Sequence, residues 1–125
     1  MILNMFKARR KVDAPLLLLE RVTAASRAPA LYLEAGVPDT FEGRFECLTL
    51  HAFLVMRRLR ELPDPAGEVA QEFVDHIFAH LDQGLRQSGI GDLGVPKRMK
   101  KMAQGFYGRI DAYDSAMEGG DRAVL

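Results

Sequence analysis

Residues 39–62 decide the fold, and they read DTFEGRFECLTLHAFLVMRRLREL. Apolar side chains recur there at steps of three and four residues, the spacing of one face of an α-helix. Asp39 or Thr40 is suited to cap its start, with Glu42 placed as in a capping box. Further apolar residues widen the stripe in the middle, which is typical of the central helix of a bundle. The stripe consists of Phe41, Phe45, Leu48, Ala52, Val55, Leu59 and Leu62, widened by Leu50, Phe53, Leu54 and Met56.

Towards the N-terminus the same helical spacing continues. Asp13 and Pro15 predict the cap and the first residue of a helix that runs to about Arg27, because proline is pre-set for a first helical turn. A short turn of helix over residues 30–35 is expected to end at Gly36, since glycine readily adopts the left-handed conformation that follows a helix.

Towards the C-terminus the spacing predicts two further long helices. Asp64 and Pro65 are placed as cap and first residue of a helix that stops at Ser88-Gly89. A loop over residues 90–95 then leads to Pro96 and the last helix. The two stripes are Val69, Phe73, Ile77, Leu81 and Leu85, and then Met99, Met102, Phe106, Ile110, Tyr113 and Met117. With no period-two pattern, we predict an all-α fold: a single compact domain of about four main helices plus a short helical turn.

Composition fits one globular domain. The 125 residues include 17 Lys and Arg against 17 Asp and Glu, and 48% are hydrophobic. The single cysteine excludes an intrachain disulfide framework. The longest apolar stretch, residues 47–56, is too short to span a membrane, and the N-terminus does not read as a signal peptide. We expect a cytoplasmic protein with a flexible basic arm over 1–12, a helical domain over 13–118 and a disordered tail over 119–125.

Three patterns are better explained by structure than by chemistry. Residues 89–94 match G-x-G-x-x-G, but a helix precedes them where a dinucleotide-binding loop follows a strand, so a tight turn is the preferred interpretation. Glu72, His76 and His80 share one helix edge without a firm further ligand, which is a weak metal pattern. Cys47 lacks any sign of a neighbouring base. We predict no catalytic residue, no metal site and no cofactor.

The zero net charge conceals three unlike regions. Residues 1–60 carry a net +4, residues 61–94 a net −6, and residues 95–125 a net +2. Lys97, Arg98, Lys100 and Lys101 lie at the start of the last helix, where the helix dipole disfavours positive charge. Two interpretations stay open: a solvated polar face, or a docking surface for an anionic partner such as RNA, lipid headgroups or an acidic protein.

Three segments are distinctive in their order and spacing. Residues 33–45 read LEAGVPDTFEGRF, and residues 48–60 read LTLHAFLVMRRLR. Residues 91–102 read GDLGVPKRMKKM and are followed by Phe106-Tyr107-Gly108-Arg109. Together they resemble the ubiquinol–cytochrome c chaperone family in its bacterial form, over about residues 16–117.

The resemblance implies an all-helical, non-enzymatic chaperone that binds newly made cytochrome b during assembly of the cytochrome bc1 complex. It also implies the ribosome and a second assembly factor as further partners. The basic run adds an anionic membrane surface, so the expected location is the cytoplasm or the periphery of the inner membrane. The alternative is a ribosome- or RNA-binding helical adaptor that uses the basic patches. The oligomeric state stays open. The candidate partner-binding residues are Lys97, Arg98, Lys100, Lys101, Met99, Met102, Phe106, Tyr107, Arg109 and Arg44.

Overall fold

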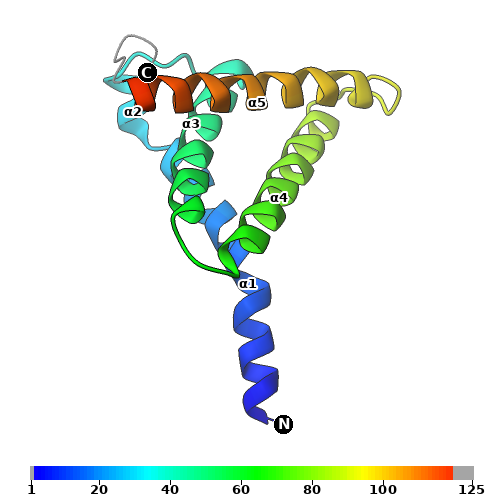
Figure 1. The fold of residues 1–125 in the computed structure, drawn as a ribbon. Coiled ribbons are helices and arrows are strands. Elements are labelled where there is room, and N and C mark those ends of the chain that lie inside the picture. The colour runs from blue at the N-terminus through cyan, green and yellow to red at the C-terminus, as the bar shows by residue number, and fades with distance from the viewer. Residues whose placement is uncertain (1, 120–125) are drawn as a thin grey trace. The chain divides into compact units, whose positions relative to one another are not determined.

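The computed structural model describes the backbone of residues 2–119 and the side chains of residues 14–119. It contains five helices, and no strand occurs within residues 2–119 (Figure 1). This confirms the all-α class with four long helices and one short helical turn. The helices are α1 (Ile2–Ser26), α2 (Pro29–Leu33), α3 (Phe41–Arg60), α4 (Ala66–Gln87) and α5 (Val95–Gly119).

The chain divides into two compact units, Met1–Ile77 and Phe78–Leu125, with the boundary inside α4. In the first unit α1 packs against α3. The buried residues of these two helices are Pro15, Val22, Ser26, Gly43, Cys47, Leu48, Thr49, Ala52 and Phe53. The apolar stripe predicted for residues 41–62 is therefore only partly buried, since Phe41, Leu54 and Leu62 are exposed.

The predicted helix start at Asp13 is wrong, because α1 begins at Ile2 and contains Pro15. A proline inside a helix loses one backbone hydrogen bond and crowds the preceding turn, at a cost of about 3 kcal/mol. Pro15 is fully buried, and packing of its ring offsets part of that cost. The flexible arm over residues 1–12 stays a prediction. Most of the predicted tail, residues 120–125, lies outside the described residues.

Thr40, not Asp39, caps α3. The Thr40 side-chain oxygen Oγ1 accepts a hydrogen bond from the Gly43 backbone N–H at 3.1 Å. Asp39 instead accepts from the Arg44 guanidinium Nε at 2.8 Å. Just upstream, Gly36 has φ +77°, as the predicted stop after the short helix requires.

Removing this cap gives a test of the start of α3. Thr40→Ala is expected to lower the free energy of unfolding by about 1 kcal/mol, because the Gly43 N–H loses its partner. Thr40→Ser keeps an acceptor at the same position and is the matched control. Urea unfolding followed by circular dichroism measures both, and an equal loss in the two variants would contradict the assigned role of the hydroxyl.

Around the only cysteine, side chains of the first unit pack closely. Cys47 is buried on α3, with 6% of its surface exposed. The Tyr32 hydroxyl donates to the Ser26 carbonyl oxygen at 2.9 Å. Burial, followed by the neighbouring Cys47 thiol, raises the pKa of Tyr32 above its ordinary value. The short helix α2 is thus tied to the end of α1.

The second unit contains the end of α4, a tight turn and α5. The Gly89 N–H donates to the Arg86 carbonyl and the Ile90 N–H to the Leu85 carbonyl, both at 3.3 Å. With φ +91° at Gly89, this is the Schellman arrangement that ends a helix. It confirms the predicted stop at Ser88-Gly89. The predicted start of α4 at Pro65 is one residue early, and that of α5 at Pro96 one residue late.

Candidate functional site

The four cations of the basic run all lie on the surface of α5. Lys97, Arg98, Lys100 and Lys101 are exposed, and within residues 14–119 none of them forms a side-chain hydrogen bond or ion pair. The first turn of α5 contains no acidic residue. Because a helix start disfavours each positive charge by about 0.3–1 kcal/mol, stability of the helix gives no reason for this run. Its charge is available to an anionic partner.

An open groove lies beside this run, within the second unit. It has a volume of about 490 Å³ and a mostly apolar lining. α4 contributes Phe78, Ala79, Asp82, Gln83 and Arg86, and α5 contributes Met99. Met99 stands between Arg98 and Lys100 in the sequence, so the apolar groove and the cationic surface meet at this residue. A methionine side chain adapts its shape readily to an apolar ligand.

Three aromatic rings pack against one another, and one of them, Phe78, lines the groove. The Phe78 and Phe106 ring centroids are 5.3 Å apart in an edge-to-face arrangement with an interplanar angle of 67°. Tyr107 contacts both rings, at centroid distances of 5.9 Å to Phe78 and 5.4 Å to Phe106. Phe106 is fully buried, whereas Tyr107 is 49% exposed. Phe106 therefore belongs to the core and packs against the groove residue Phe78, and Tyr107 is the ring of this pair that a partner can reach.

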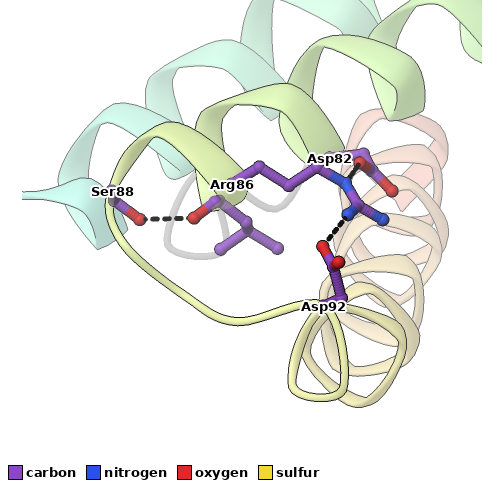
Figure 2. Close-up of polar contacts among 5 residues, drawn as sticks. Asp82, Arg86, Ser88 and Asp92 are labelled. Carbon is purple, nitrogen blue, oxygen red and sulfur yellow. Dashed lines mark hydrogen bonds and ion pairs between the residues drawn. The ribbon is translucent and has the colours of Figure 1, made fainter.

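Arg86 joins the end of α4 to the following loop (Figure 2). Its Nε lies 2.7 Å from Asp82 Oδ1, and its Nη1 lies 2.5 Å from Asp92 Oδ1. The hydrogen bond and the charge of Asp82, and more weakly Asp92, raise the pKa of Arg86 above its ordinary value. The guanidinium stays charged and is shared between the two carboxylates, so the three side chains together carry a net charge of −1.

The candidate residues from the sequence do not form one cluster. Met99 lines the groove, Met102 is half-buried and Arg109 is exposed. Arg44 belongs to the other unit, where its guanidinium pairs with Asp39 at the start of α3. Its local role is therefore at that helix start.

Most of the groove was not predictable from the sequence. Of its lining residues only Met99 is among the candidate partner-binding residues, and Phe78, Asp82, Gln83 and Arg86 are not. Two features of the sequence could have indicated Asp82 and Arg86. They stand four residues apart on one helix, and Arg86 is the only basic residue between Glu61 and Gly94.

The glycine-rich pattern and the weak metal pattern both lie in ordinary structural elements. Residues 89–94 form the turn between α4 and α5, with a helix on either side. Within residues 14–119 no three His, Cys, Asp or Glu side chains gather closely enough to hold a metal ion, and this includes Glu72 and His76. Among the described residues, none of the helices is both long enough and apolar enough to cross a bilayer.

These features define an all-helical protein with an exposed cationic surface beside an open, mostly apolar groove. The model of the ubiquinol–cytochrome c chaperone family matches residues 33–125, and the chain belongs to this family. The resemblance predicted from the three sequence segments is thereby confirmed.

The chain is also similar to two individual proteins. It is 43% identical to the Cbp3 homolog from Brucella abortus, whose crystal structure it matches with a TM-score of 0.78 over 100% of this chain and 70% of that one. It is 24% identical over 93 residues to the mouse ubiquinol–cytochrome c reductase complex assembly factor 1. That match covers 74% of this chain, and the chain spans about a third (32%) of the mouse protein.

Proposed function

We propose that this chain is a non-enzymatic assembly chaperone of the cytochrome bc1 complex and that it binds newly made cytochrome b. The observation that carries the proposal is membership of the chaperone family over residues 33–125, together with a mouse relative named as an assembly factor of ubiquinol–cytochrome c reductase. The structural likeness to the Brucella protein over the whole chain supports it.

The groove on the second unit suits such a client. Cytochrome b is a membrane protein, so before assembly it presents apolar helix surface that a chaperone must cover. Met99 and Phe78 offer polarizable apolar contacts in an open groove, and Gln83 offers a polar group at its edge. The cations from Lys97 to Lys101 add attraction for anionic groups of the client or its surroundings, which salt would weaken.

Loss of the gene is the first test. Deleting it is expected to deplete assembled cytochrome bc1 complex and cytochrome b, as measured by haem spectra and native electrophoresis of membranes. Restoring the wild-type gene is the control. Normal cytochrome b levels in the deletion strain would contradict the proposal. Co-purification with the tagged protein from native membranes then identifies the client and any second assembly factor.

A charge placed in the groove tests the binding surface. Met99→Asp is expected to weaken cytochrome b capture at least about tenfold, because losing the burial of one methionine costs about 1.5–3 kcal/mol and each 1.4 kcal/mol is tenfold. Met117→Asp is the matched control, since Met117 lies near the other end of α5 and is partly exposed. Equal capture by the two variants would remove the groove from the client surface.

The exposed basic run also favours a second candidate, a ribosome- or RNA-binding adaptor. Binding to RNA phosphates releases counterions, so affinity would fall steeply with salt. Sedimentation of the protein with ribosomes at increasing salt tests this. A steep salt dependence, with cytochrome b assembly intact in the deletion strain, would favour the adaptor over the chaperone.

A further inference from the structure

The loop between α4 and α5 carries an unusually exposed leucine. Leu93 is 98% exposed, more than any other large apolar side chain in the described part of the protein. It lies in the turn that directly precedes α5, between Asp92 and Gly94. The Gly94 N–H donates to the Gly91 carbonyl at 2.9 Å, and the Arg98 N–H donates to the Gly94 carbonyl at 3.3 Å. These bonds fix the leucine at the start of α5.

The segment that follows Leu93 is strongly cationic. From Gly94 to Ile110 the chain has five basic residues and no acidic one. The nearest of these, Lys97, follows Leu93 by one helical turn. Asp92 is the only carboxylate of the loop, and Arg86 holds it in an ion pair (Figure 2). An exposed apolar tip thus directly precedes a run of cations, and Arg86 compensates part of the negative charge beside it.

We propose that this end of the second unit docks on an anionic lipid surface. Leu93 inserts among the headgroups, and Lys97, Arg98, Lys100 and Lys101 contact the lipid phosphates. A single apolar insertion anchors a protein only weakly, and neighbouring cations supply the remaining attraction. Lipid docking goes beyond the proposed chaperone function, since it needs no client and can be measured on the purified protein.

A lipid surface fits the combination better than RNA does. Proteins that bind single-stranded RNA place aromatic rings or arginine planes against the bases. The most exposed side chain here is an aliphatic leucine, which gains from apolar burial and cannot stack on a base. Charge alone would suit both partners, so the leucine distinguishes them.

Vesicle binding of the full chain tests the proposal. Sedimentation with vesicles of equal parts phosphatidylcholine and phosphatidylglycerol is expected to capture the protein, and vesicles of phosphatidylcholine alone to capture much less. Leu93→Ser should lower the partition coefficient about tenfold. Lys100→Ala combined with Lys101→Ala should lower it about 25-fold, since each cation near an anionic surface contributes about fivefold.

Matched controls lie in the first unit. Leu33→Ser removes a leucine that is 84% exposed but stands next to Glu34. Arg21→Ala with Arg27→Ala removes two exposed cations. Both controls are expected to change the partition coefficient less than twofold. All of these side chains are exposed, so unchanged circular dichroism and urea midpoints are expected and are measured alongside.

Arg86→Ala adds a separate check on the charge of the loop. It frees the Asp92 carboxylate beside Leu93, so weaker vesicle binding is expected. The additional substitution Asp92→Asn should restore binding.

Three results would overturn the proposal. The first is equal capture by anionic and neutral vesicles, and the second is full binding by the Lys100 and Lys101 double variant. The third is binding to ribosomal RNA that the lysine variant loses and Leu93→Ser retains, without vesicle binding, which would assign the surface to nucleic acid. Because the assay contains no cytochrome b, its failure leaves the chaperone function untouched, and normal bc1 assembly in the deletion strain leaves the vesicle result untouched.

Discussion

Replacing Phe106 with alanine is expected to lower the free energy of unfolding by about 3–5 kcal/mol. The ring has no exposed surface, and its edge-to-face contact with Phe78 joins α4 to α5 within the second unit. Its contact with Tyr107 lies within α5. Truncation removes the buried ring and leaves a cavity that the surrounding helices fill only in part. Urea unfolding followed by circular dichroism measures the loss as a shift of the midpoint at constant slope.

Two variants separate the packing of Phe106 from partner binding. Phe106→Leu keeps much of the apolar volume and is expected to cost less than about 1.5 kcal/mol. Tyr107→Ala removes a half-exposed ring and should also cost much less than Phe106→Ala. If Phe106→Ala unfolded at the wild-type urea concentration but lost client capture, the ring would be a contact residue and its assignment to the core would be wrong.

Replacing Gly43 with alanine is expected to destabilise the protein by about 1–3 kcal/mol, although alanine is the better helix former. A Cβ on Gly43 would overlap the carbonyl oxygen of Pro38, far inside van der Waals contact. The atom it meets is backbone, so it cannot move aside as a flexible side chain would. Relief of the overlap requires the segment before Thr40 to shift, which also disturbs the cap of α3.

Gly84→Ala is the matched control for that substitution. Gly84 lies inside α4, and a Cβ there would meet nothing within 4 Å. Helix propensity alone then acts, so this variant is expected to gain up to about 1 kcal/mol. The two substitutions should therefore change the free energy of unfolding in opposite directions. A stabilising Gly43→Ala would contradict the close approach of Pro38 to α3.

The sequence predicted the helices well because their burial follows a simple period. The α4 stripe is an example: Phe73, Ile77, Leu81 and Leu85 are all buried at the predicted spacing. The start of α1 was not predictable from the local pattern. Proline is compatible with a first helical turn and, at a cost, with a helix interior, and at Pro15 burial of the ring favours the interior.

The charge of the candidate site could be predicted from the sequence, whereas the groove beside it could not. The basic run from Lys97 to Lys101 is exposed, as a docking surface requires. The groove beside it depends on which side chains of α4 face α5, and helix spacing alone does not determine that pairing. Phe106 belongs both to the apolar stripe predicted for the last helix and to the candidate partner-binding residues, and its ring is fully buried, as the stripe predicts. Leu93 gave no signal, because one leucine in a loop has no periodic context.

The burial of Cys47 has a practical consequence for measuring motion. It is the only thiol of the chain, and it is almost completely covered on α3. A thiol-specific reagent can then react only during transient openings that expose this side chain, and its labelling rate reports how often they occur. Comparing the labelling rate with and without a partner bound to the second unit would show whether that binding changes how often the first unit opens. No probe has to be introduced.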